Sequence, residues 1–107
     1  LAEATHLPTL IFDEVDTGIS GEIAVQMGKM MEKMSRDHQL ITITHLPQIA
    51  SVGEQHYFVY KATDGDKARS RIKLLNTNDR IQEIAQMIGG NNPSQTAQDS
   101  AKELLNL

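Results

Sequence analysis

The chain has 107 residues, 39% of them hydrophobic, with ten Lys and Arg residues against fourteen Asp and Glu residues and a formal net charge of -4. These values predict a single domain over residues 1–107, and the acidic balance gives no overall reason to expect nucleic-acid binding. The absence of cysteine excludes disulfides and thiolate metal sites, and the lack of a transmembrane-length apolar run predicts a soluble, cytoplasmic protein without membrane contact.

The first predicted elements form a strand–helix–strand unit. Thr9 to Phe12 is a short apolar and β-branched run, typical of a strand buried on both faces, and Leu40 to Thr44 is a second such run. Between them we expect a helix that begins after Ser20 as N-cap and ends near Asp37. Its apolar stripe comprises Ile23, Met27, Met30, Met31 and Met34. In such a crossover unit the two strands run parallel.

The second half of the sequence predicts an antiparallel hairpin. His56 to Lys61 and Arg69 to Leu75 read as two strands, and Asp64-Gly65 between them is a turn signal. Basic and apolar residues alternate along the second strand, so we expect one of its faces to be exposed to solvent.

Two helices are predicted after the hairpin. The first is expected from Asn78, with a stripe of Ile81, Ile84, Ala85 and Ile88, and ends at Gly89-Gly90. The second is expected to open at Asn92-Pro93, with Gln95 three residues after the cap, and to bury Ala97, Ala101, Leu104 and Leu105. The predicted fold class is therefore α/β, with a parallel strand–helix–strand unit, an antiparallel hairpin and two C-terminal helices.

Acidic and imidazole side chains follow the two predicted parallel strands. Asp13 and Glu14 come directly after the first strand, and Thr44 and His45 close the second. Ligands of open parallel sheets bind beyond the carboxyl ends of the strands, so we expect both motifs at one edge. Asp13 can hold a hydrated Mg²⁺, Glu14 can orient or deprotonate a water, and His45 can donate a hydrogen bond to phosphoryl oxygens. The pattern predicts half of a phosphoryl-transfer site.

Three motifs in this order resemble those of ABC-type ATPases. LIFDE resembles a Walker B strand, VDTGISG the D-loop, and ITITHLPQIA the switch-histidine strand and loop. Together with QHYFVYK and IQEIAQMIGG, they resemble the C-terminal end of the RecN family of bacterial DNA-repair proteins, which are related to SMC proteins. The resemblance covers nearly the whole chain from Pro8 onward. It implies the C-terminal lobe of a P-loop (ABC/SMC-type) ATPase head.

The resemblance also implies roles for single residues. Asp13 would help hold Mg²⁺ through its water shell, Glu14 would be the general base, and His45 would contact the γ-phosphate of ATP. The implied D-loop meets a second head across two sandwiched ATP molecules, and it includes Asp16, Gly18, Ser20 and Gly21. Gln48 belongs to the stretch after His45 and receives no role.

Parts of the family pattern are missing from the sequence. There is no G-x-x-x-x-G-K-[ST] motif, no Q-loop and no ABC signature, although Leu1-Ala2 can be interpreted as the tail of the signature helix. The resemblance therefore implies an N-terminal Walker A lobe, a second head and DNA as partners of the full-length protein at the bacterial nucleoid. Alone, the chain is expected neither to bind ATP tightly nor to hydrolyse it. It is also expected to expose an apolar face and a sheet edge, and so to self-associate.

Two other functions stay open at this point. In a stand-alone Mg-dependent phosphotransferase, Asp13 would be the nucleophile and Asp16 a partner acid, although such enzymes use Asp-x-Asp and His45 would have no role. In a non-catalytic interaction module the acidic turn would be a docking loop. The basic residues of the hairpin are interpreted as a solvated surface, with contact to DNA or a neighbouring domain as the alternative, and they are Lys61, Lys67, Arg69, Arg71 and Lys73.

Overall fold

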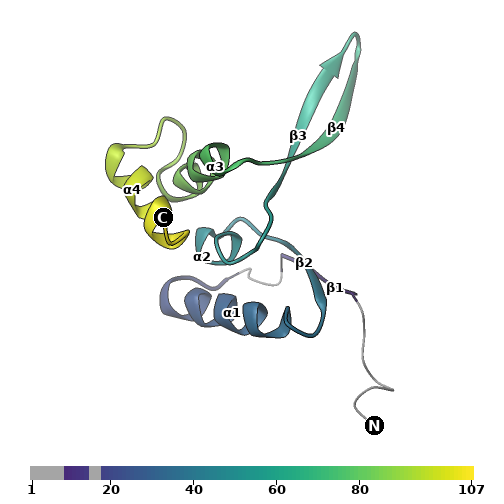
Figure 1. Ribbon diagram of the computed structural model, residues 1–107. Helices are drawn as coiled ribbons and strands as arrows, with labels where there is room; N and C mark the ends of the chain where they lie inside the picture. Colours follow the sequence, from purple (N-terminus) through teal and green to yellow (C-terminus); the bar gives the residue numbers. More distant parts are fainter. Residues whose placement is uncertain (1–8, 15–17) are drawn as a thin grey trace.

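The computed structural model describes residues 9–14 and 18–107 (Figure 1). Its elements in chain order are β1 (Thr9–Asp13), α1 (Gly21–Met34), β2 (Gln39–Ile43), α2 (Pro47–Ala50), β3 (Tyr57–Asp64), β4 (Lys67–Leu74), α3 (Thr77–Gly89) and α4 (Gln95–Leu104). Asp16 and Leu1-Ala2, to which the sequence assigns a D-loop position and a signature tail, lie outside the described residues. The predicted α/β class is confirmed, because all the predicted strands and helices are present.

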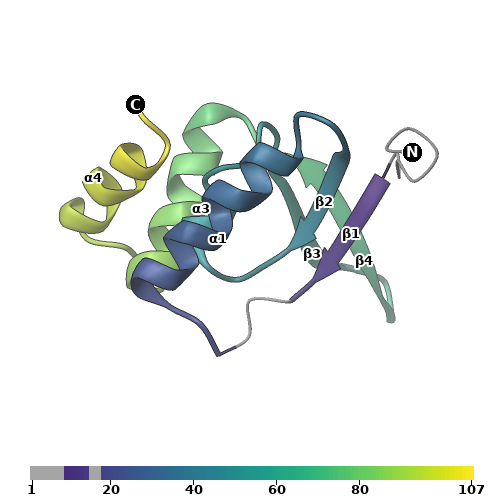
Figure 2. The same cartoon turned by 90° about the horizontal axis from the view of Figure 1, so that it is seen from below.

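The strands β1 and β2 form a two-stranded parallel sheet, connected through α1 (Figure 2). The expectation that both strands are buried on both faces is wrong, because residues alternate between partly buried and exposed along each strand. On the covered face, the Thr42 hydroxyl donates to the sulfur of Met31 in α1 over 3.9 Å. The opposite face carries Ile11, Ile41 and Ile43, which are 45–66% exposed, since no described element packs over it.

The buried stripe of α1 differs from the predicted one. Ile23 and Met30 are more than half exposed. The buried positions are Ala24, Gly28 and Met31. Ser20 occupies the N-cap position as predicted, but its side chain makes no capping hydrogen bond. Of the predicted stripe, Met31 is buried as expected, but the other two buried positions are small residues, so a stripe drawn through the largest apolar side chains points partly into solvent.

The strands β3 and β4 form an antiparallel hairpin that projects away from the helices (Figure 1). Its turn has two central residues, Gly65 and Asp66, and Gly65 has a φ of +66°, which suits the first central position of a type II′ turn. The predicted hairpin is confirmed, but the expectation of only one exposed face is wrong, because every residue of β4 is exposed. The projection explains this result, since little of the described chain packs against either face.

The main core lies between α3 and α4. It is a cluster of Ile81, Ile84, Ala85 and Ala101, with Ala50, Met87, Leu104 and Leu105 packed against it. The predicted stripe of α3 is confirmed except for Ile88, which is 39% exposed. Asn76 caps this helix, because its side-chain oxygen accepts a hydrogen bond from the Asp79 amide over 2.8 Å.

The start of α4 lies slightly later than predicted. Ser94, not Asn92, is the N-cap, because its hydroxyl accepts a hydrogen bond from the Ala97 amide over 3.1 Å. Asn92 has a φ of +55° and belongs to the turn before the helix. Within the described part of the chain, none of the helices has the length and apolar character needed to cross a bilayer.

Candidate functional site

The parallel sheet brings the two predicted site motifs to the same edge. Asp13 ends β1 and lies opposite Ile43, which ends β2. The Glu14 amide donates to the Ile43 carbonyl over 2.9 Å, so the pairing continues one residue beyond the strand. Thr44 and His45 follow Ile43 directly. The acidic pair and the imidazole therefore leave the sheet at its carboxyl edge, and Asp13, Glu14 and His45 are all exposed.

Glu14 has an unusual backbone conformation. Its φ is +52°, in the left-handed region that residues other than glycine rarely adopt. This conformation costs about 1 kcal/mol, and the hydrogen bond from the Glu14 amide to Ile43 helps to hold it. Strain of this kind concentrates at functional sites, so the backbone singles out the same residue as the sequence motif does.

A short helix follows His45 and was not predicted. The Leu46 amide donates to the Thr44 hydroxyl over 3.0 Å, and Pro47 begins α2. Proline suits a first helical position, because its ring sets φ and the missing N–H would have no helical partner. The dipeptide Leu46-Pro47 was the available signal, but a single turn is too short to show apolar periodicity.

Gly28 lets α1 approach α2 closely. A Cβ atom at Gly28 would lie 2.9 Å from the backbone oxygen of Gln48, a distance that real Cβ atoms do not show. The backbone of Gln48 thus packs against α1 at Gly28, and no chemical role follows from that contact. A glycine inside a predicted helix is the sequence signal for such a close approach.

Arg80 of α3 donates hydrogen bonds to the C-terminal end of α2. Its Nη2 donates to the carbonyl oxygens of Ala50 over 3.1 Å, of Ser51 over 3.4 Å and of Gly53 over 2.5 Å. Carbonyl groups at a helix C-terminus lack helical partners and carry partial negative charge, so a guanidinium suits this position. Burial lowers the pKa of Arg80 from its ordinary value. Sequence spacing offered no signal for this contact.

His56 lies near Arg80 at the start of the hairpin. Burial, and then the positive charge of Arg80, lower the pKa of His56, so its neutral form is favoured. Its Nδ1 is buried and has no hydrogen-bond partner among the described residues. His56 is not one of the predicted site residues, and it directly precedes β3.

The acidic pair fits Mg²⁺ only together with a phosphate ligand. Within residues 9–14 and 18–107, no group of three or more His, Cys, Asp or Glu residues could hold a metal ion. Mg²⁺ usually keeps several waters and binds one or two carboxylates together with substrate phosphates. Asp13 and Glu14 supply that number of carboxylates, so their chemistry agrees with a hydrated, nucleotide-bound ion.

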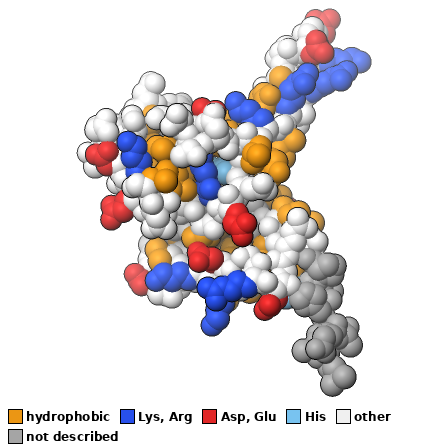
Figure 3. All heavy atoms as spheres, viewed as in Figure 1, with side chains coloured by type: hydrophobic (Ala, Val, Ile, Leu, Met, Phe, Trp, Pro, Cys, Tyr) orange, Lys and Arg blue, Asp and Glu red, His pale blue; other side chains and the backbone are white. Residues whose placement is uncertain are grey.

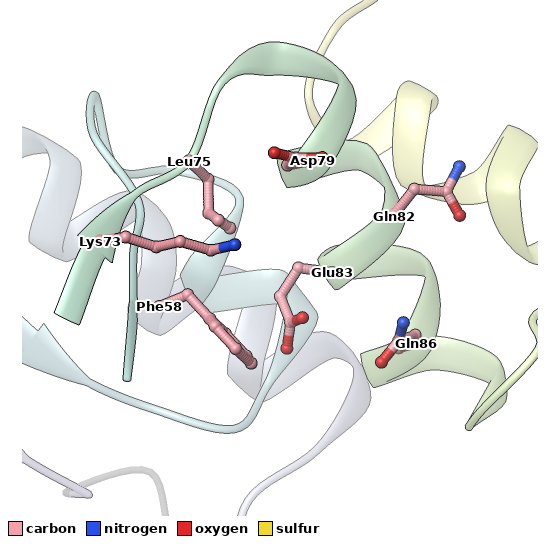
Figure 4. Close-up of a pocket in the computed structure, with 7 residues that line it drawn as sticks. All are labelled: Phe58, Lys73, Leu75, Asp79, Gln82, Glu83 and Gln86. Atoms are coloured by element: carbon pink, nitrogen blue, oxygen red, sulfur yellow. The ribbon is translucent and has the colours of Figure 1, made fainter. Parts of the chain in front are cut away.

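A groove of about 260 Å³ lies between the hairpin and α3, away from the acidic pair (Figure 4). Lys73 of β4 extends across it toward α3, while Phe58 of β3 lines its hairpin side (Figure 4). The remaining lining residues are Leu75, Asp79, Gln82, Glu83 and Gln86. Burial raises the pKa of Glu83. None of the predicted site residues lines this groove.

Comparison with known structures identifies the fold. A solved structure, reported for ATP-driven dimerization and DNA stimulated activation of SMC ATPases, matches the fold with a TM-score of 0.63. The match covers 81% of this chain and 52% of that chain at 13% sequence identity. The chain therefore has the fold of an SMC ATPase segment.

Sequence comparison then identifies the family, although no family profile matches the chain. The chain is 40% identical over 97% of its length to DNA repair protein RecN of Vibrio cholerae. It is 39% identical over 92% of its length to the RecN protein of Streptomyces coelicolor, and 43% identical over 92% to that of Xylella fastidiosa. The chain belongs to the RecN family, as its motifs predicted. It spans 17–19% of the length of these relatives.

Proposed function

We propose that residues 1–107 form the C-terminal lobe of the ATP-hydrolysing head of a RecN-type protein. The observation that carries this proposal is the register of β1 and β2, with Glu14 bonded to Ile43 beyond the last paired residues. The relatives are named DNA repair proteins, and the motifs resemble those of a family that acts on double-strand breaks. We therefore propose the same role here, in the bacterial cytoplasm at the nucleoid.

Each residue at the carboxyl edge would have its own role in the hydrolysis of ATP. Glu14 would accept a proton from the attacking water and orient it. His45 would donate a hydrogen bond to the γ-phosphate of ATP, where negative charge accumulates. Asp13 would hold the water shell of Mg²⁺, and the ion would neutralise phosphate charge when bound with ATP.

The proposed partner of this lobe is the N-terminal Walker A lobe of the same protein. The sequence has no phosphate-binding loop, so the cradle for ATP has to come from elsewhere. Two apolar surfaces fit such a partner, namely the exposed face of the parallel sheet and the face of the hairpin on which Val59 lies opposite Ile72. The two separate two-stranded sheets also have unpaired edges within the described residues.

The glycine-bracketed turn before α1 would form the D-loop and meet a second head. Gly18 has a φ of +84° and Gly21 a φ of +58°, so the backbone on both sides of Ser20 adopts left-handed conformations that suit glycine. Asp16, the acidic residue of this proposed loop, lies outside the described residues. A homodimer with two ATP molecules between its heads would use this turn.

A chimeric protein tests the proposed catalysis. This chain would replace the matching segment of the Vibrio cholerae RecN protein, and ATP turnover would be measured with Mg²⁺. We expect Glu14→Gln to lower turnover by about 100-fold or more, because proton transfer by a positioned base typically contributes that much. The matched control is Glu22→Gln, which neutralises an exposed carboxylate in the first turn of α1. Unchanged turnover in Glu14→Gln would contradict the proposal, and phosphate trapped covalently on Asp13 would favour a phosphotransferase instead.

The isolated chain offers two further tests. Without a phosphate cradle we expect no ATP turnover above background, so Mg²⁺-dependent turnover that is lost in Glu14→Gln would refute the assignment as one lobe. Because apolar faces and strand edges are exposed, we also expect the isolated chain to self-associate as its concentration rises. Sedimentation of a strict monomer over a wide concentration range would count against this expectation.

A further inference from the structure

The two faces of the hairpin differ in chemistry. On one face, Tyr57 lies opposite Leu74 and Val59 opposite Ile72, and these four side chains are 52–65% exposed. On the other face, Phe58, Tyr60 and Ala62 of β3 lie opposite Lys73, Arg71 and Arg69 of β4. Alternate residues of a strand point to the same side, so Lys67 and its cross-strand partner Asp64 join the second face at the tip.

We call Lys67, Arg69 and Arg71 the basic stripe of β4. The hairpin holds five of the ten Lys and Arg residues but only two of the fourteen acids, which are Asp64 and Asp66. Lys and Arg side chains extend along the projecting hairpin in the surface view (Figure 3). Within the described residues, no side-chain hydrogen bond or ion pair holds any member of the stripe. Its charges are therefore available to an external anion, although the chain as a whole is acidic.

Lys73, at the base of the hairpin, is already engaged. Its ammonium lies 5.6 Å from the centre of the Tyr60 ring, and it extends across the groove toward Glu83 (Figure 4). The Tyr60 ring stacks on Phe58 at 5.9 Å with an angle of 13° between the planes. The Tyr60 ring therefore contacts both the Phe58 ring and the Lys73 ammonium. The aromatic pair is not an open platform for unpaired bases.

The spacing of the stripe suits a nucleic-acid backbone. Residues two apart on a strand are about 6.8 Å apart along it, and phosphates of one DNA strand advance about 3.4 Å per step along the helix axis. Because the phosphates also wind around the axis, neighbouring phosphates of one strand are separated by about twice that axial step, so side chains two residues apart can meet successive phosphates of one strand. The exposed, projecting position of the hairpin leaves room for a rigid duplex (Figure 1).

We propose that the basic stripe of β4 binds the phosphate backbone of double-stranded DNA without reading its sequence. The apolar face of the hairpin and the basic stripe point in opposite directions, so a neighbouring lobe can cover the first and leave the second open. The surface requires no nucleotide and no catalytic residue. If the DNA-binding proposal were wrong, the proposed ATPase site would be unaffected. If the ATPase proposal were wrong, DNA binding by the stripe would be unaffected.

Fluorescence anisotropy of a labelled DNA duplex tests the proposal with the complete 107-residue chain. Three phosphate contacts predict that affinity falls about 40-fold between 50 and 200 mM salt, because each contact contributes about 0.9 to the slope of log K against log salt. In the triple variant Lys67→Gln, Arg69→Gln, Arg71→Gln, affinity at 50 mM salt should fall at least tenfold and the salt dependence should nearly vanish. The double variant Arg69→Lys, Arg71→Lys should bind within about threefold of the original chain, since it keeps the charge.

The matched control removes the same charge elsewhere. Lys29→Gln, Lys33→Gln, Lys102→Gln neutralises three exposed lysines on α1 and α4, and should leave affinity within about threefold. Circular dichroism of every variant checks that the fold is retained. The same measurement in the Vibrio cholerae chimera, made in the Glu14→Gln background, separates DNA binding from ATP turnover.

Four results would overturn the proposal. They are absence of duplex binding at 50 mM salt, equal affinity in the stripe variant and the original chain, an equal loss in the control variant, and tighter binding of single-stranded DNA or of RNA than of the duplex. The first two would mean that the stripe is only a solvated surface. The third would mean that the overall charge of the chain, and not this face, sets the affinity for DNA. The fourth would mean that the partner is another nucleic acid.

Discussion

The helical and the stranded parts of the molecule bury their apolar side chains to different extents. In the α3–α4 pair, Ile84 is fully buried and Ile81 nearly so. In the two sheets, Ile11, Val59 and Ile72 are each about two-thirds exposed. A second helix can bury the single apolar stripe of a helix. A sheet with apolar residues on both faces needs a covering layer on each face to bury them. The helical pair therefore buries most of its apolar stripe within this chain, whereas both sheets leave apolar side chains uncovered within the described residues.

The largest expected effect on stability is the difference between matched substitutions in these two regions. Ile84→Ala is expected to lower the free energy of unfolding by about 2–5 kcal/mol, because it leaves a cavity in the core. The matched substitution Ile72→Ala, on the exposed face of the hairpin, should cost less than about 1 kcal/mol. Urea unfolding of the two variants measures both values. Equal losses would mean that the hairpin face is buried in solution, for example by self-association, and that the contrast is not a property of the single chain.

The contact between α3 and α2 should give the next largest effect. Arg80→Ala removes a charged donor from three carbonyl groups, and we expect a loss of about 1.5–3 kcal/mol in the free energy of unfolding. Arg80→Lys should recover only part of it, since an ammonium is more strongly hydrated than a guanidinium and loses more on leaving water. Arg71→Ala, which removes an exposed arginine, is the control. A loss below about 0.5 kcal/mol in Arg80→Ala would mean that water replaces the guanidinium without cost.

A smaller effect is expected at the packing of α1 against α2. Gly28→Ala gains about 1 kcal/mol in helix propensity but places a methyl group against the Gln48 backbone oxygen. Because a backbone atom cannot move aside easily, we expect a net loss of about 1–2 kcal/mol. Lys29→Ala, on the exposed side of the same helix, is the control. A more stable Gly28→Ala variant would mean that α2 shifts readily and that its position is loosely defined.

The smallest effect should be a dependence of stability on pH through His56. Burial, with the nearby charge of Arg80, lowers the pKa of His56 in the folded chain, so the unfolded chain binds a proton first as the pH falls. The contribution of His56 is therefore complete above about pH 6.5, the ordinary pKa, and is lost as the pH falls toward the lowered folded value. Urea midpoints between about pH 7.5 and about pH 5.5 should fall less in His56→Gln than in the original chain. An identical fall in both would assign the effect to other groups.

Sequence reasoning recovered the elements and their pairing because these depend on local patterns. Short apolar runs predicted the parallel strands, Asp64-Gly65 predicted the hairpin, and the spacing of isoleucines predicted α3. The motif after each parallel strand also located the acidic pair and the imidazole at one edge of the sheet. Strand order and direction then followed from the length of the crossover.

The misses share a physical cause, namely dependence on neighbours that a single sequence does not reveal. The strands read as buried on both faces because apolar residues occur on both, yet burial also requires covering layers. The contacts of Arg80 with α2 join residues far apart in the chain, so no spacing rule could find them. Gly28 and Leu46-Pro47 did carry local signals, but a glycine within a helix and a one-turn helix are weak ones.

The tip of the hairpin has a practical consequence. Nothing lies within 4 Å of the position that a Cβ atom of Gly65 would occupy, and the turn is closed by only two residues. Exposed tips of this kind tolerate inserted peptides better than other parts of a domain. A fluorophore or a small affinity tag placed between Gly65 and Asp66 would thus extend into solvent, where it could report the approach of a large ligand without disturbing the helical core.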